Sequence, residues 1–400
     1  MDNNNTKTWL CSLPWTGFSN DPDGKVRPCC IYKGHITNSQ GNPYYVQTSS
    51  VKEIFTSRFM SDLRKEFLDG KQPKGCETCI KDESNNFRSK RQTYMSFLRQ
   101  DTKLFESEPD LPVEYQMILS NACNLKCRSC TPSHSNLWQA EHKILFGNNG
   151  YSMPHGQSGH NESVLWKDRQ EWMSYVKRLE IVGGEPFYIK QWKDLWREMV
   201  ELGYSKNIDM DMSTNCNIFD TESLDLIIKN FKRVGIGLSI DGLDNVYEYL
   251  RHPGNWSEVS KNILNYHNLV KLNKGNFDIS YTHTIGWINA WYLPEFHSWT
   301  RKNTPGVRIW NNIIHYPEHM CLWMIPVSVK DLIIKKWNTF DWKEYTTDVE
   351  GLKNFMYSVE PTEERLKNEY KKFALHDLHR NERLQSVLPK SILDSLVNLI

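Results

Sequence analysis

Three cysteines stand close together in the segment Cys123-Asn-Leu-Lys-Cys127-Arg-Ser-Cys130. They follow an apolar run, 113–119, whose pattern is typical of a buried strand. A tight loop at the end of a strand can point all three sulfurs at one iron–sulfur cube. Such clusters are normally held by four cysteines, so three cysteines leave one iron open for an outside ligand. This arrangement suits a cluster that acts on a substrate.

Two other interpretations of this loop are a zinc knuckle and three unrelated buried thiols. Zinc sites mostly use paired Cys-x-x-Cys segments and four protein ligands. The spacing here, Cys-x3-Cys-x2-Cys, differs from that pairing. The residues therefore favour an iron–sulfur cluster over zinc, and the elements around the loop must supply the rest of the argument.

A second group of cysteines lies in the first hundred residues. Cys11 and the pair Cys29–Cys30 flank an Asp23-Gly24 turn that is typical of a hairpin. Cys76 and Cys79 form a Cys-x-x-Cys segment farther along. A hairpin and a helix end would together supply four sulfurs. Iron–sulfur and zinc both fit such a set, and either cysteine of the pair can be the fourth ligand.

Polar residues also stand where three further strands are expected to end. The first group is Gly183-Gly184-Glu185-Pro186, in which two glycines allow a ligand to approach bare backbone and the carboxylate can accept hydrogen bonds from an ammonium group. The others are Ser213-Thr214-Asn215-Cys216 and Ser239-Ile-Asp241-Gly242, with Arg251 one helix later. Because sites on parallel barrels gather at the carboxyl ends of the strands, we expect these groups to lie at one edge.

The elements that must position these residues alternate between strand and helix from residue 113 onward. This alternation predicts a parallel sheet with helices outside it. Strands are expected at 113–119, 178–182, 207–213, 234–240, 277–285 and 307–314, with helices such as 137–146 and 191–202 between them and a loop at 147–159. Helices are also expected at 50–70, where Ser50 and Glu53 form a capping box, along the basic connector 82–99 as a solvated face, and at 327–337, 362–375 and 383–399.

Composition limits the remaining possibilities. The 400 residues carry a net charge of +1, so no global field draws the chain to nucleic acid or acidic membranes. No apolar run has the length of a membrane span, and the N-terminus lacks the apolar stretch of a secretory signal. With ten cysteines at close spacings and no export signal, metal ligation is expected in place of disulfides. We expect a cytoplasmic protein.

The cysteine spacing at the end of the first strand, together with the motifs that follow, resembles the radical S-adenosylmethionine enzymes. The resemblance implies that Cys123, Cys127 and Cys130 hold a catalytic [4Fe–4S] cluster, that S-adenosylmethionine binds the open iron, and that an electron cleaves it to a 5′-deoxyadenosyl radical. Two departures are Ser129, where many members carry an aromatic residue, and Cys216, where a glycine is frequent. The residues implied in cofactor binding are Gly183, Gly184, Glu185, Pro186, Ser213, Thr214, Asn215, Ser239, Asp241 and Arg251.

The N-terminal segment resembles the auxiliary-cluster modules called SPASM or twitch domains. Their Gly-x4-Cys signature falls on Gly24 and Cys29, which favours Cys29 over Cys30. The resemblance implies one auxiliary iron–sulfur cluster, expected to be [4Fe–4S], held by Cys11, Cys29, Cys76 and Cys79. Four protein thiolates leave no open iron, so electron relay is the expected role. A four-cysteine zinc ribbon is the alternative.

The resemblance completes the expected architecture. We expect an α/β fold in which a twitch/SPASM-like domain (1–104) precedes a partial (β/α)6 radical S-adenosylmethionine barrel (105–320) and a C-terminal helical extension (321–400). The implied reaction is hydrogen abstraction from a substrate, with a reductant such as flavodoxin or ferredoxin as partner. A peptide or protein is the favoured substrate class. The alternatives are a sugar or other small metabolite, or a non-catalytic zinc-stabilised binding protein.

Overall fold

The computed structural model of this chain describes residues 9–84, 88–98, 102–147, 163–345 and 347–397. It divides into two compact units, each built from several stretches of the chain. The first unit comprises 1–121, 153–212 and 225–234, and the second comprises 122–152, 213–224 and 235–400. These units cut across the expected domain ranges, so the boundaries 1–104, 105–320 and 321–400 stay a prediction.

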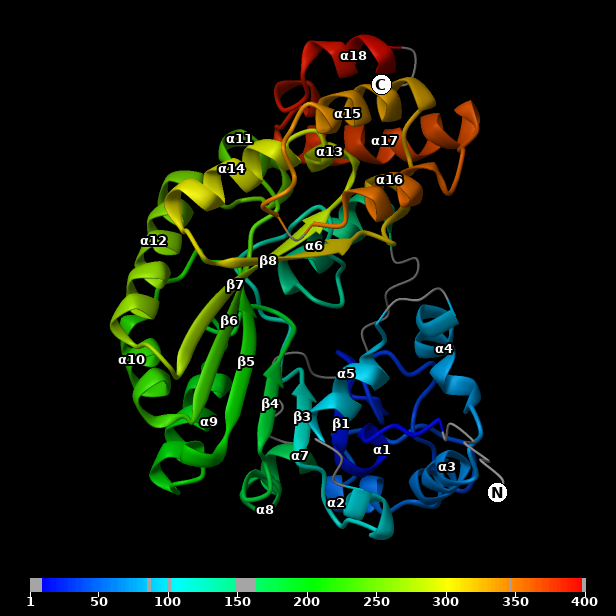
Figure 1. The fold of residues 1–400 in the computed structure, drawn as a ribbon, viewed down its shortest axis with the longest axis vertical. Coiled ribbons are helices and arrows are strands. Elements are labelled where there is room, and N and C mark those ends of the chain that lie inside the picture. Colours follow the sequence, from blue (N-terminus) through cyan, green and yellow to red (C-terminus); the bar gives the residue numbers. More distant parts are fainter. Residues whose placement is uncertain (1–8, 85–87, 99–101, 148–162, 346, 398–400) are drawn as a thin grey trace, which may run out of the picture. The chain divides into compact units, whose positions relative to one another are not determined.

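The sheet of the first unit has the strand order β2-β1-β3-β4-β5 (Figure 1). A short hairpin joins β1 (Gly17–Asn20) and β2 (Val26–Arg27), which pair antiparallel on either side of the predicted Asp-Gly turn. Strands β3 (Glu114–Met117), β4 (Arg178–Ile181) and the start of β5 (Asp209–Thr214) pair parallel. The hairpin and these three strands are confirmed.

Strand β1 also pairs parallel with β3, with Phe18 opposite Tyr115. Beyond the end of this ladder, the side chain of Asn20 donates to the carbonyl of Ile118 at 2.9 Å and accepts from its N–H at 3.1 Å. The amide thus extends the pairing by imitating a backbone unit. The N-terminal cysteine segment is therefore joined to the sheet through hydrogen bonds that its own sequence pattern does not reveal.

The helix expected at 50–70 is two helices, α2 (Val51–Phe55) and α3 (Arg58–Leu68). Ser50 caps the first helix by accepting from the N–H of Glu53 at 3.1 Å, as the capping box predicted. The chain leaves the helical path at Thr56 and Ser57 and starts again, so the single helix was wrong. The other helices of this unit are α1 (Leu13–Thr16), α4 (Glu77–Ser84), α5 (Lys90–Phe97), α7 (Val164–Lys167), α8 (Arg169–Met173) and α9 (Lys190–Glu201).

The second unit continues with β6 (Arg233–Ser239), whose first residues belong to the first unit, and with β7 (Phe277–Ile285) and β8 (Arg308–Ile313). Strands β7 and β8 pair parallel from Ser280–Arg308 to Ile285–Ile313. The six barrel strands expected from the sequence are thus all present as β3 to β8. Helices α6 (Asn136–Phe146), α10 (Thr221–Asn230), α11 (Asp244–Leu250), α12 (Trp256–Leu272), α13 (Trp287–Ala290) and α14 (Leu293–Asn303) alternate with them. The α/β class with a parallel sheet is confirmed.

The C-terminal helices of the second unit share one apolar core (Figure 1, orange to red). These helices are α15 (Val327–Asn338), α16 (Val349–Tyr357), α17 (Glu363–Arg380) and α18 (Lys390–Leu396). The helix expected at 383–399 was wrong: Pro389 separates a short 3-10 turn from α18. The core contains Trp287, Trp337, Tyr370 and Phe373.

Two expectations about special segments have separate outcomes. Most of the loop expected at 147–159 falls in 148–162, outside the described residues. In the part of the chain that the structure describes, no helix is both long and apolar enough to cross a membrane.

Candidate functional site

The cysteine loop of the second unit begins at Cys123, and two side chains of α6 hydrogen-bond to its backbone. The N–H of Cys123 donates to Asn136 at 3.0 Å, and the indole of Trp138 donates to the carbonyl of Cys127 at 2.6 Å. Both partners lie on α6, so the helix after the loop fixes its shape. Burial raises the pKa of the Cys130 thiol, and Cys127 and Cys123 raise it further. The three sulfurs therefore lie near one another, as the spacing predicted.

The second half of the loop is attached to the end of α11. The N–H of Lys126 donates to the carbonyl of His252 at 2.8 Å, and the N–H of Arg128 donates to that of Leu250 at 2.7 Å. The guanidinium of Arg128 stacks 3.7 Å from the ring centroid of Tyr249 and donates to its carbonyl at 3.0 Å. These contacts leave the loop between Cys127 and Cys130 little freedom.

Helix α17 and the turn after it close this attachment from the C-terminal end of the chain. Arg128, which is 2% exposed, pairs with Asp377 at 2.5 Å and with Glu382 at 2.6 Å. Tyr249 donates its hydroxyl to the same Asp377 at 2.9 Å, and His252 pairs with the same Glu382. Asp377 and Glu382, two side chains near the C-terminal end of the chain, therefore fix Arg128, which lies between Cys127 and Cys130 in the sequence.

Glu141 on α6 is the centre of a second buried network. Its carboxylate pairs with Lys126 at 2.5 Å, Arg380 at 2.7 Å and His376 at 3.3 Å. Burial alone would raise the pKa of this carboxyl, but the three partners lower it well below the usual value. Arg380 also donates to the carbonyl of Lys126 at 2.9 Å. Sequence reasoning missed both networks, because their members are some 240 residues apart and carry no local signal.

Asp241 and Arg251 are brought to the cysteine loop, as the motifs predicted. Arg251 pairs with Asp241 at 2.8 Å, and one of its nitrogens lies 3.9 Å from the sulfur of Cys127. The carboxylate is held by the N–H of Thr284 at 2.9 Å, and its backbone carbonyl accepts from Asn289 at 2.8 Å. The Nε of Arg251 is buried without a hydrogen-bond partner among the described residues, which fits a carboxylate-bearing cofactor.

The Ser213–Cys216 segment reaches the same loop through Asn215. Its side chain donates to Asn124 at 2.8 Å and lies 3.9 Å from the sulfur of Cys123. Cys216 adopts a left-handed φ of 63°, a conformation that glycine adopts without strain. Cys216 is fully buried and packs as a small apolar residue. Ser213 is exposed and Ser239 is half-buried.

The Gly-Gly-Glu-Pro segment lies in the first unit at the end of β4. Gly183 and Gly184 have φ values of 81° and 60°, and a Cβ on Gly183 would lie 2.7 Å from the Cγ2 of Ile118. Only glycine fits there. Glu185 is 1% exposed and accepts from the N–H of Phe187 at 3.4 Å. Its carboxylate is thus buried at a strand end, where a cationic ligand group would pair with it.

The four N-terminal cysteines gather within the first unit. Burial raises the pKa of Cys11 well above its usual value, and Cys29, Cys76 and Cys79 each add to the rise, which places all three near it. Burial likewise raises the pKa of Cys29 to about 11 and that of Cys76 to about 12. Cys29 follows β2, and Cys76 and Cys79 lie at and just after the start of α4. Cys11 precedes α1 and is not on an arm of the hairpin, so that part of the expectation was wrong. The ligand set itself stays a prediction.

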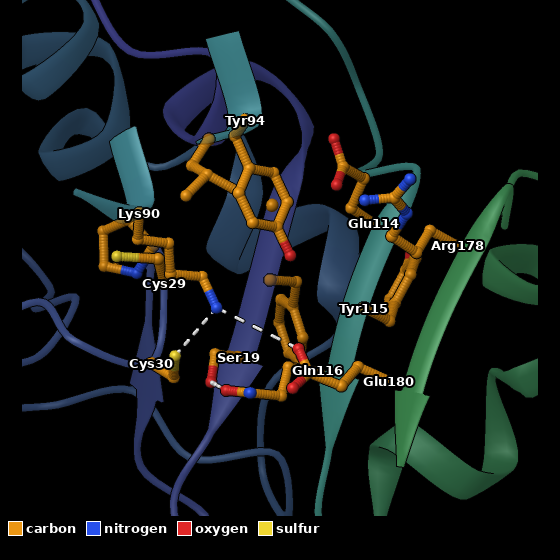
Figure 2. A pocket seen from close by; sticks show the side chains of 14 residues that line it. Ser19, Cys29, Cys30, Lys90, Tyr94, Glu114, Tyr115, Gln116, Arg178 and Glu180 are labelled. Carbon is orange, nitrogen blue, oxygen red and sulfur yellow. Dashed lines mark hydrogen bonds and ion pairs between the residues drawn. The ribbon is translucent and has the colours of Figure 1, made fainter. Parts of the chain in front are cut away.

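Cys30 has a different environment from its neighbour Cys29. Its sulfur accepts a hydrogen bond from the ammonium of Lys90 at 3.0 Å, and that ammonium lies 4.0 Å from a carboxylate oxygen of Glu180 on β4 (Figure 2). The cavity beside them has a volume of only about 20 Å³, enough for about one water molecule. The sulfur of Cys30 is therefore already hydrogen-bonded to Lys90, and this supports Cys29 as the cluster ligand.

The connector helix α5 is not the solvated face that its charge predicted. Lys90 turns inward to Cys30, and Arg91 pairs with Glu83 at 2.6 Å. Arg91 also stacks 4.8 Å from the ring centroid of Trp9 and donates to the carbonyl of Leu10 at 2.7 Å. The solvated interpretation was wrong at these two residues, which fix the segment that carries Cys11.

The donor sets fit iron–sulfur clusters in number and chemistry. All ten cysteines are free thiols, and thiolates are the usual ligands of such clusters. Among the described residues, no three His, Cys, Asp or Glu side chains converge on one ion-sized position. The cysteines of an iron–sulfur cube bind different irons and lie farther apart than the ligands of one ion. The fit therefore rests on the number, chemistry and proximity of the thiols.

Comparisons with known proteins agree with this arrangement. Residues 117–284 match the model of the radical SAM superfamily, and residues 11–80 match the model of an iron–sulfur cluster-binding domain, SPASM. No curated protein matches the sequence. The two matched regions contain the three loop cysteines and the four N-terminal cysteines, respectively.

Several solved structures are similar to the chain. The Streptococcus suis protein SuiB bound to S-adenosylmethionine is 16% identical, with 72% of this chain and 59% of that chain covered and a TM-score of 0.38. SuiB bound to the precursor peptide SuiA is 15% identical, with 70% of this chain and 58% of that chain covered and a TM-score of 0.37. The protein anSMEcpe with bound AdoMet is 17% identical, with 67% of this chain and 59% of that chain covered and a TM-score of 0.38. The chain thus spans about three fifths of the length of these proteins.

The fold and the two matched regions define an iron–sulfur protein with a parallel α/β sheet. More particularly, residues 117–284 match the radical SAM superfamily, and residues 11–80 match the SPASM iron–sulfur cluster-binding domain. Its cofactors are a [4Fe–4S] cluster and S-adenosylmethionine, with an auxiliary iron–sulfur site in the SPASM domain.

Proposed function

We propose that this chain reductively cleaves S-adenosylmethionine and abstracts a hydrogen atom from a peptide or protein substrate. The observation that carries the proposal is the proximity of Cys123, Cys127 and Cys130 on a loop that also meets the Asp241–Arg251 pair. Three protein ligands leave one iron for a small molecule. The alternative substrate class is a sugar or other small metabolite.

The Asp241–Arg251 pair beside the loop, and Glu185 as its motif implies, would bind and orient the cofactor. When bound, the cluster and S-adenosylmethionine supply a 5′-deoxyadenosyl radical. Glu185 would accept from the methionine ammonium group, and the free Nε of Arg251 would donate to its carboxylate. Asp241 would keep that guanidinium in place, because it is itself held by Thr284 and Asn289. The half-buried loop would limit the access of water to the cluster.

We propose electron relay for the N-terminal site. Four cysteines would fill every iron of its cluster, so it could bind a substrate only by losing a ligand. The peptide class rests on analogy with SPASM proteins, many of which modify peptides. A flavodoxin or ferredoxin would be the source of electrons.

The test is anaerobic reconstitution followed by an assay for 5′-deoxyadenosine. Cys127→Ala should abolish its formation, because one of three ligands is lost, while Cys321→Ala should not, because that buried cysteine of the second unit lies outside the loop. Native cleavage by the Cys127 variant would refute the assignment. Protein that contains zinc with neither iron nor sulfide would favour the non-catalytic binding protein.

A further inference from the structure

We propose that a cavity beside the cysteine loop of the second unit takes a phenolic side chain of the substrate, with its hydroxyl group held by Arg128 and His319. Its peptide nature rests on the proposed function. The cavity has a volume of about 540 Å³, within the roughly 300–1,000 Å³ typical of small-ligand pockets. Cys130 and Thr131 line it. An occupant would therefore lie next to the loop that holds the proposed cluster.

The walls of the cavity are rich in flat rings. Trp138 and Phe146 come from α6, and Tyr316 comes from the segment after β8. His376 on α17 packs edge-on against both α6 rings, at centroid distances of 5.0 Å from Trp138 and 5.6 Å from Phe146. Ring edges and faces of this kind favour another ring over an aliphatic chain. The lining therefore points to an aromatic occupant.

The charged groups that line the cavity are already paired with one another or with neighbours. A charged ligand group would lose its hydration there and gain no free counter-charge. The part of the ligand that enters is therefore neutral. The pairs are Arg128 with Asp377 and Glu382, Lys372 with Glu369, and Glu318 with Arg365.

The two buried histidines of the lining are neutral near pH 7. Burial, helped by His376, Lys372 and Arg128, lowers the pKa of His319 to about 3. Burial also lowers the pKa of His376, although its contact with Glu141 opposes the shift. A neutral imidazole offers one nitrogen that accepts a hydrogen bond. The cavity therefore contains an acceptor that carries no charge.

Two buried nitrogens of the lining residues have no hydrogen-bond partner among the described residues. They are the Nδ1 of His319 and the Nη1 of Arg128. A carboxylate oxygen of Glu369 lies 3.9 Å from that Nδ1, beyond hydrogen-bond distance. One hydroxyl oxygen can accept from a guanidinium and donate to an imidazole. A phenol satisfies both nitrogens, whereas a plain phenyl ring leaves both unpaired.

The experiment uses the full chain with reconstituted clusters and two small probes, p-cresol and toluene. Ligand-detected NMR under anaerobic conditions measures their affinities at millimolar concentrations. We expect p-cresol to bind at least about tenfold more tightly than toluene, because its hydroxyl group makes one hydrogen bond to a charged guanidinium and one to a neutral imidazole. We also expect the signals of bound p-cresol to broaden when dithionite makes the loop cluster paramagnetic. Cys127→Ala protein should bind p-cresol without that broadening.

Two variants locate the probe. His319→Leu should reduce p-cresol binding to the level of toluene, while His315→Leu, at an exposed histidine nearby in the sequence, should leave the preference unchanged. If His319→Leu does not fold, Phe146→Ala provides the second test. It should weaken both probes several-fold, and Ile144→Ala, at an exposed position of the same helix, should weaken neither.

Three results would overturn the proposal: no binding of p-cresol, equal binding of both probes, or displacement of p-cresol by S-adenosylhomocysteine. The last result would assign the cavity to the adenine of the cofactor. Each is independent of the proposed function, because 5′-deoxyadenosine formation is measured separately in the same preparation. Loss of cleavage with retained p-cresol preference would refute the activity and leave the cavity assignment standing.

Discussion

The two groups of cysteines are assembled in opposite ways. The loop group places three cysteines within eight residues, from Cys123 to Cys130, so local spacing alone nearly sets its geometry. The N-terminal group takes its four sulfurs from the segment before α1, the end of the hairpin and the start of α4, from Cys11 to Cys79. The first group needs distant residues only for support, whereas the second exists only when its unit is folded. Variants should therefore affect the two groups differently.

The largest expected effect is that of Cys76→Ala on the N-terminal group. A metal site contributes much of the folding free energy of a small module, so this variant should loosen the N-terminal segment and lose about four irons per chain. Cleavage of S-adenosylmethionine should persist while substrate turnover fails. Iron analysis and limited proteolysis measure both effects.

Cys30→Ala is the matched control for that variant, because the sulfur of Cys30 already accepts a hydrogen bond from Lys90. It should keep its iron, while Cys29→Ala should lose it. Full iron in Cys76→Ala, or loss in Cys30→Ala with retention in Cys29→Ala, would contradict the assignment of the ligands.

Support of the loop group is tested by Glu141→Gln. The change leaves Lys126 and Arg380 without their buried carboxylate, which should lower the free energy of unfolding by about 3 kcal/mol at pH 7. Because the folded pKa of Glu141 is depressed, its contribution is complete above the usual pKa of 4.5 and is lost as the pH falls through the lower folded value. Urea denaturation at several pH values should show the difference shrinking in acid.

Glu364→Gln removes an exposed carboxylate from α17 and controls for the loss of charge. It should change stability by less than about 0.5 kcal/mol. A Glu141→Gln protein that matches this control at pH 7 would show that the C-terminal helix does not support the loop.

An intermediate effect is expected for cofactor binding. Glu185→Gln and Arg251→Lys each weaken one proposed charge-assisted contact, worth about 1.5–3 kcal/mol. Affinity for S-adenosylmethionine should fall about ten- to a hundred-fold, with the iron of both groups retained. Equilibrium dialysis measures it, and unchanged affinity in either variant would remove that residue from the site.

The smallest effect concerns Lys90. Lys90→Met removes the cation beside Cys30 and Glu180, and should lower the reduction potential of the auxiliary cluster while its iron is retained. Lys90→Arg preserves the charge and should restore the potential. An EPR-monitored redox titration distinguishes them. Identical potentials in all three proteins would show that Lys90 acts only in packing.

The same contrast explains what the sequence could predict. Strands β3 to β8 were found because their apolar residues alternate, and the cysteines were found because closely spaced thiols are typical cluster ligands. Each of these signals is local. The paired helices α2 and α3 and the break at Pro389 were misjudged because local propensity does not set where a helix pauses.

The support of both groups could not be predicted, because it is non-local. Arg128 meets Asp377, and Lys90 meets Glu180, only after the chain has folded. A basic run such as 88–91 has the same composition whether it faces water or a thiol. Ion pairs between distant residues leave no periodicity in the sequence, so only the folded structure shows which charges are buried.

The central claim is that one group leaves an iron open and the other does not. The most direct measurement is the EPR spectrum of the dithionite-reduced protein with and without S-adenosylmethionine, in Cys76→Ala and in Cys127→Ala. We predict that the cofactor changes the spectrum of Cys76→Ala, which keeps the loop cluster, and leaves that of Cys127→Ala unchanged. The account would be contradicted if S-adenosylmethionine left the spectrum of Cys76→Ala unchanged. It would also be contradicted if S-adenosylmethionine changed the spectrum of Cys127→Ala.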